Sequence, residues 1–69
     1  MTVVEVQVNG DPYRGAPGTT VADLVAAWCV SPRGVAVARN GEVVPRSAWD
    51  ATTIAAGDRI EIVTAAAGG

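Results

Sequence analysis

Residues 4–28 read VEVQVNGDPYRGAPGTTVADLVAAW and predict two short strands followed by one helix. The first five residues alternate valine with polar side chains, which is the period of a half-buried strand. Asn9-Gly10 tolerates the positive φ angles of a tight hairpin turn, so residues 11–14 are expected to return as a second strand. Because Pro12 cannot donate a ladder hydrogen bond, this second strand is expected at a sheet edge.

The helix is expected to follow the loop of residues 15–18. Thr19 or Thr20 can cap its N-terminus, and Asp23 lies three residues past Thr20 with its charge near the positive helix end. Apolar residues at spacing i, i+3, i+4 and i+7 form the stripe of a helix that lies on a sheet. These residues are Val21, Leu24, Val25 and Trp28. The sequence SPRG at 31–34 is expected to end the helix.

The second half of the chain repeats the opening pattern. Residues 35–44, VAVARNGEVV, contain an extended run, a second Asn-Gly turn and a short return strand, which Pro45 closes. Residues 47–58 have weak periodicity and are expected to be irregular. Their apolar anchors are expected to be Trp49 and Ile54. Residues 59–64, RIEIVT, predict a last strand whose two isoleucines face inward.

The order of these elements predicts an α+β fold of the β-grasp, or ubiquitin-like, type. The first strand must pair with the last if both hairpins are to share one sheet beneath one helix, with a right-handed crossover. The expected architecture is a mixed sheet of four to five strands with one main helix on one face. The domain is expected to span residues 1–64, and residues 65–69 are expected to form a flexible C-terminal tail ending in Gly-Gly.

Composition excludes several classes of protein and site. Sixty-nine residues make one domain, and 49% apolar against 17% charged residues is too hydrophobic for a disordered chain. One cysteine, Cys29, allows no internal disulfide and no four-thiolate cluster, which favours a reducing compartment. The absence of histidine removes the usual general base and the usual zinc ligand. No metal site and no catalytic residue are predicted.

Charge and hydropathy limit the partners. The net charge is −2 and the five basic residues, all arginines, are scattered, so nucleic acid is not expected as a partner. No run approaches the roughly 20 apolar residues of a membrane span, and the N-terminus does not resemble a signal peptide. We therefore expect a cytoplasmic protein with no membrane partner.

The closing residues, TAAAGG, suggest chemistry at the C-terminal carboxylate. A terminal carboxyl group with a pKa of about 3.5 is ionised at neutral pH, so it can attack an activated phosphorus atom but must be activated before a nucleophile can attack it. Such activation takes place inside another enzyme, which the tail must enter. Gly68 and Gly69 lack Cβ atoms, and five extended residues from Ala65 reach about 17 Å.

Several segments together resemble the ThiS family, the sulfur carriers of thiamine thiazole biosynthesis. They are VQVNGDP, TVADLV, VAVARNGEVVPRSAW, AAGDRIEIV and the terminal GG. The resemblance implies a carrier that is not an enzyme and binds no cofactor of its own. Gly69 would be adenylated with ATP by an E1-like activating enzyme (ThiF- or MoeB-like). A cysteine desulfurase or other persulfide donor would supply sulfur for a thiocarboxylate, which thiazole synthase (ThiG) would use.

The resemblance and the tail assign roles to the last residues. Gly69 is expected to carry the adenylate and then the sulfur, while Gly68, Ala67 and Ala66 give the tail access to enzyme sites. Val63 and Ala65 are expected to contact partners. The family often has larger apolar residues before its final glycines, so the three alanines reduce the contact area.

Other side chains are interpreted as structural. Cys29, Trp28 and Trp49 are expected to pack in the core, and Arg39 and Arg46 to be solvated. The outer sheet face is expected to expose Val63 and Val3. It would also expose Val35 and Val37 if Ala36 and Ala38 are the small residues beneath the helix. An exposed apolar patch of this kind marks a partner surface.

Three alternatives remain open from the sequence. The small subunit of molybdopterin synthase, or another thiocarboxylate carrier, shares the fold and the tail, although the length and the segment NGEVVPRSAW favour the thiazole pathway. A ubiquitin-like protein modifier would join Gly69 to lysines of its targets. A plain β-grasp binding module would have an inert tail.

Overall fold

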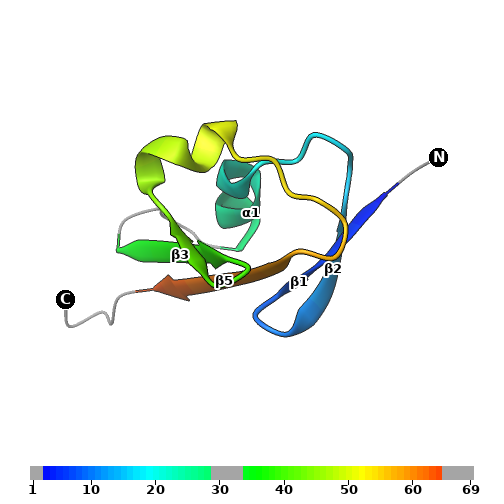
Figure 1. The fold of residues 1–69 in the computed structure, drawn as a ribbon, viewed down its shortest axis with the longest axis horizontal. Helices are drawn as coiled ribbons and strands as arrows, with labels where there is room; N and C mark the ends of the chain where they lie inside the picture. The colour runs from blue at the N-terminus through cyan, green and yellow to red at the C-terminus, as the bar shows by residue number, and fades with distance from the viewer. Residues whose placement is uncertain (1–2, 29–33, 65–69) are drawn as a thin grey trace.

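The computed structural model describes residues 3–28 and 34–64 and has one mixed sheet with a helix on one face (Figure 1). In chain order the elements are β1 (Val4–Val8), β2 (Asp11–Gly15), α1 (Val21–Trp28), β3 (Val35–Arg39), β4 (Glu42–Val44), the 3₁₀ helix η1 (Arg46–Ala51) and β5 (Arg59–Thr64). The strand order is β2-β1-β5-β3-β4, and β1 and β5 are parallel. This confirms the α+β β-grasp fold predicted from the element order.

Both hairpins turn at an Asn-Gly pair, as predicted. Asn9 and Asn40 each have φ of 53°, and the glycines after them have φ of 86° and 87°. This is the left-handed conformation that asparagine tolerates and glycine adopts freely. Pro12 lies in β2 at the sheet edge, where its missing N–H leaves no gap in an inner ladder.

A reciprocal cap fixes the start of α1. The Thr20 hydroxyl accepts from the Asp23 N–H at 3.1 Å, and the Asp23 carboxylate accepts from the Thr20 N–H at 3.0 Å. Thr20 is therefore the cap, whereas the Thr19 hydroxyl donates to the Ala16 carbonyl at 2.7 Å. The expected stop signal SPR and Cys29 lie outside the described residues.

The core fills the space between the sheet and the layer of α1 and η1, which Figure 1 shows on the same side of the sheet. Its buried apolar residues are Val6, Val8, Val21, Leu24, Val25, Val37, Trp49, Ile54, Ile60 and Ile62. The predicted anchors Trp49 and Ile54 and the inward isoleucines of β5 are confirmed. The segment expected to be irregular begins as η1, whose three-residue turn explains its weak periodicity at the α-helical spacing.

Trp28 was wrongly predicted to close the core. Its side chain is 40% exposed and lies edge-on to Tyr13 of the edge strand, with ring centroids 5.1 Å apart. The three preceding stripe residues fill the space above the inner strands. Trp28, at the last described turn of α1, contacts Tyr13 of β2 instead and stays partly exposed.

The facing of β3, which the sequence left open, places its valines on the helix side. Val37 is buried and Val35 half-buried, whereas Ala36 is exposed. Val37 lies opposite Ile62 in the antiparallel ladder, and directly opposed residues share a face of the sheet. The larger valines therefore occupy the helix side because they fill the core, and the alanines lie on the outer face.

Asp58 joins the second hairpin to the turn before β5. Its carboxylate accepts from Arg39 Nε at 2.8 Å, Asn40 Nδ2 at 2.9 Å and the Ala55 N–H at 2.8 Å. Arg39 is therefore ion-paired rather than simply solvated as predicted. Burial alone would raise the pKa of Asp58, but the hydrogen bonds and the Arg39 charge outweigh burial and lower it.

Asp58→Asn is expected to lower the free energy of unfolding at pH 7 by about 1.5–3 kcal/mol, because hydrogen bonds to a charged group are lost. Since the folded pKa is depressed, the wild-type advantage is complete above the unfolded value of about 3.9 and disappears as the pH falls through the folded value. Urea unfolding of both proteins across this range measures the difference. Asp50→Asn, at an exposed aspartate of η1, is the matched control; an equal loss there would contradict the assignment.

Candidate functional site

The candidate site is the exit of the chain from β5. This strand lies at the centre of the sheet between β1 and β3, and it runs toward the side of the molecule opposite the start of β1 (Figure 1). Thr64 is its last residue and lies opposite Val35. The predicted tail residues Ala65, Ala66, Ala67, Gly68 and Gly69 lie outside the described residues. The structure therefore fixes the position of Thr64, from which the predicted tail would continue.

Asn9 anchors β5 just before this exit. Its side-chain oxygen accepts from the Ile62 N–H at 2.8 Å, and its side-chain nitrogen donates to the Ile62 carbonyl at 3.1 Å. The backbone N–H of Asn9 donates to the Ile60 carbonyl, and the amide side chain extends the same ladder two residues further along β5, to Ile62. The sequence identified Asn9 only as a turn former, because nothing local shows that it reaches a residue 53 positions away.

Exposed apolar side chains adjoin the exit on the outer face. Val63 is 62% exposed and lies opposite Ala36. Val43 of β4 is 77% exposed and lies opposite Ala38. We call Ala36, Ala38, Val43 and Val63 the outer patch. The sequence identified Val63 but missed Val43, whose position depends on the pairing of three strands; Val3 is also exposed, at 52%, ahead of β1.

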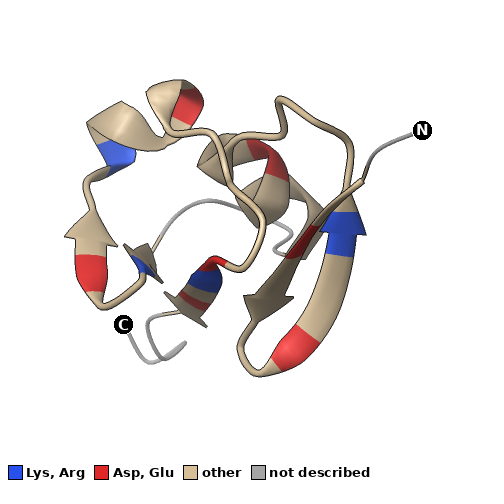
Figure 2. Cartoon of the chain, turned by 45° about the vertical axis from the view of Figure 1, so that its right-hand side comes forward, with Lys and Arg blue, Asp and Glu red and all other residues tan. Residues whose placement is uncertain are grey.

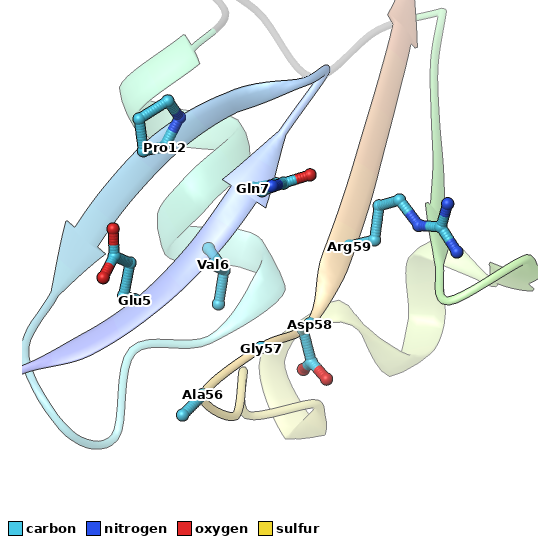
Figure 3. A pocket seen from close by; sticks show the side chains of 8 residues that line it. All are labelled: Glu5, Val6, Gln7, Pro12, Ala56, Gly57, Asp58 and Arg59. Atoms are coloured by element: carbon cyan, nitrogen blue, oxygen red, sulfur yellow. The ribbon is translucent and has the colours of Figure 1, made fainter.

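A hollow on the outer face lies between β1 and the turn before β5. It measures about 610 Å³ and includes Glu5, Gln7, Gly57 and Arg59 in its lining. Figure 3 shows the Glu5 and Arg59 side chains pointing away from each other, so the opposite charges do not converge on one point. This arrangement does not resemble a small-molecule site, in which polar groups converge.

The charged residues are distributed over the described part of the chain without a basic stripe (Figure 2). Arg46 lies over the Trp49 ring, 5.8 Å from its centroid. Within residues 3–28 and 34–64 no three acidic, cysteine or histidine side chains gather as they would around a metal ion. None of the helices among these residues has the length and hydropathy needed to cross a membrane.

Comparison with known proteins decides the family. The model of the ThiS family matches residues 6–69, nearly the whole chain. The chain belongs to the ThiS family. The resemblance found in the sequence motifs is thereby confirmed, and the match includes the segment that contains the two terminal glycines.

Solved structures support the same assignment. A crystal structure of a thiamine biosynthesis protein (ThiS) from Geobacter metallireducens is 37% identical, with a TM-score of 0.71, over 96% of this chain and 100% of that one. A solution structure of a thiamine biosynthesis protein from the same organism is 39% identical, with a TM-score of 0.77, over 96% and 88% of the two chains. The fold of this ThiS-family chain is therefore shared along almost its full length.

Two longer relatives are named thiazole synthase. They come from Magnetococcus marinus and Paramagnetospirillum magneticum, and each is 35% identical over 66 residues. The match covers 96% of this chain but only 20% of either relative. The chain thus spans about a fifth of the length of these curated relatives, in which a segment similar to it is part of a longer polypeptide.

Asn9→Gly is expected to weaken the attachment of β5 at Ile62. Glycine keeps the positive φ but loses both side-chain hydrogen bonds to the Ile62 backbone. We expect a loss of about 1–2 kcal/mol in unfolding free energy and faster hydrogen exchange of the Ile62 amide. Exchange measured by NMR on Ile62 and on Val6, in the core of β1, separates local opening from global unfolding. Unchanged Ile62 exchange would contradict the anchoring role.

Proposed function

We propose that this chain is a sulfur carrier of thiamine biosynthesis and that the Gly69 carboxylate is the group that carries the sulfur. The observation that supports this most is the position of β5 in a chain of the ThiS family. The strand is paired with β3 up to Thr64 and is held from the β1 side up to Ile62 by the Asn9 side chain, and the segment AAAGG follows it directly. A rigid central strand followed by small residues suits a group that must reach into an enzyme site.

The proposed chemistry needs no reacting side chain of this chain. A Gly69 carboxylate oxygen attacks the α-phosphorus of ATP in the activating enzyme, and pyrophosphate leaves. A donor persulfide then displaces AMP and forms an acyl disulfide. A further thiol cleaves the S–S bond, leaving the thiocarboxylate on Gly69 and a disulfide on the donor. The chain acts as a co-substrate, and ATP is bound by its partner.

The proposed partners are the E1-like activating enzyme, a persulfide donor such as a cysteine desulfurase, and thiazole synthase. Thiazole synthase is favoured over other acceptors because the two relatives with that name contain a segment similar to this chain. The outer patch is the expected docking surface because Val63 lies one residue before the end of β5. A partner that covers it also lies beside the start of the tail. Ala65 would extend this contact.

The intact mass of the protein tests the proposal directly. Purified from sulfur-replete cells, the chain is expected to show a species in which sulfur replaces one oxygen, confined to the C-terminal peptide. Deletion of Gly68 and Gly69 is expected to abolish this species. A thioacid on any other peptide, or none after incubation with ATP, the activating enzyme and a persulfide donor, would overturn the proposal.

Changes at the terminus are expected to separate function from stability. Gly68→Val, or one residue added after Gly69, should abolish ATP–pyrophosphate exchange with the activating enzyme. A residue added there moves the carboxylate by about 3.5 Å, and even about 1 Å can cost a hundredfold in rate. The free energy of unfolding should change by no more than about 0.5 kcal/mol.

The control for these terminal changes is Ala51→Val, a similar enlargement at an exposed position of η1. It should keep both the exchange rate and the thermal midpoint. Exchange at the wild-type rate in the extended chain would show that Gly69 is not the reacting group.

A further inference from the structure

Glu61 is an acidic residue set among the apolar side chains of the outer patch. It lies opposite Ala38, which on its other side lies opposite Val43. Val63 lies two residues further along the same strand and therefore on the same face. Apolar groups thus border the Glu61 carboxylate on the β3 side and toward the exit of the tail.

The Glu61 carboxylate has no partner among the described residues: it forms neither an ion pair nor a side-chain hydrogen bond there. The nearest base on its face is Arg59, two positions earlier on β5. The Arg59 side chain leads from β5 toward β3 (Figure 3), with no ion pair to Glu61. The acid is therefore solvated in the free chain and available to a partner.

A hollow of about 200 Å³ lies beside Glu61 and gives room for one side chain of a partner. It is lined by Asn40, Gly41, Arg59 and Glu61. The Asn40 amide is already bonded to Asp58 and to the Arg59 N–H. Gly41 leaves open space, because a Cβ there would meet no atom within 4 Å. Of the side-chain acceptors that line this hollow, the Glu61 carboxylate is the one without a hydrogen-bond partner among the described residues.

A partner that docks on the outer patch changes the solvation of Glu61. A partner that covers Val63, Ala38 and Val43 also removes water from the Glu61 carboxylate beside them. A desolvated carboxylate is costly unless a cation or hydrogen-bond donors replace the lost water. A purely apolar partner surface would therefore dock with lower affinity than one that places a basic side chain beside Glu61.

We propose that Glu61 determines partner choice: the activating enzyme docks on the outer patch and places an Arg or Lys side chain in the hollow beside Glu61. This inference rests on the proposed function, because it names the contact through which the adenylating partner recognises the carrier. The partner's base lies on the Glu61 side of the hollow, since the Arg59 charge disfavours a cation on the opposite side.

Glu61→Leu gives the sharpest test, because it enlarges the apolar patch and leaves the partner's base unpaired. If Glu61 were only a tolerated surface acid, the leucine would maintain or improve docking. With the proposed contact, Glu61→Leu and Glu61→Gln each raise the KM for the carrier in ATP–pyrophosphate exchange by about 30-fold or more, with kcat nearly unchanged. A rise in KM without a fall in kcat is the signature of lost docking.

Glu42→Leu is the matched control. Glu42 is exposed on the neighbouring strand β4 but lies opposite Arg39, which faces the helix side, so its KM should stay at the wild-type value. Thermal midpoints establish that each variant is folded. A wild-type KM for Glu61→Leu, or an equal rise for Glu42→Leu, overturns the inference alone. A wild-type chain that supports no exchange overturns the proposed function and this inference together.

Discussion

The parallel pairing of β1 with β5 is the interaction on which the rest of the structure depends. It joins the two ends of the chain at the centre of the sheet, with Gln7 opposite Arg59 and Val8 opposite Ile60. Backbone bonds extend it in both directions, from the Gly57 N–H to the Glu5 carbonyl and from the Asn9 N–H to the Ile60 carbonyl. Parallel strands require a crossover, and here α1 and the second hairpin provide it. Without this pairing the β1–β2 hairpin would be a separate two-stranded unit, which is marginally stable in water, while β5 would stay paired only with β3.

The two Asn-Gly turns have a second role beyond reversing the chain. Asn9 bonds to the backbone of Ile62, and Asn40 accepts from the Arg59 N–H. Each turn therefore attaches its hairpin to β5 from one side, one near the start of the strand and the other near its end. Asp58 adds a charged contact to the same hairpin through Arg39. These polar contacts fix the central strand without using any of the apolar core.

The two faces of the sheet have different roles. The helix side is filled by Leu24, Ile60 and the other core residues, and it has no buried side-chain polar atom without a partner among the described residues. Within residues 3–28 and 34–64 no second layer covers the outer face, and the outer patch lies next to the end of β5. The proposed docking surface and the end of β5 are thus adjacent on one strand, since Glu61 and Val63 precede Thr64. Under the proposed function, replacing exposed outer-face residues is expected to change docking with little effect on the core.

The sequence by itself determined the elements and their order, because local signals are strong in this chain. Alternating valines, two Asn-Gly pairs, Thr20 with Asp23 and the spacing of the α1 stripe depend on neighbours within a few residues. The β-grasp fold followed from the order, and the family from the motifs. Which face of β3 is buried, the exposure of Trp28 and the Arg39–Asp58 pair were not predicted. The positions of Asn9, Val43 and Glu61 relative to the tail depend on strand register between distant segments. Only the tertiary structure decided these features, because cross-strand contacts join residues whose proximity no local pattern encodes.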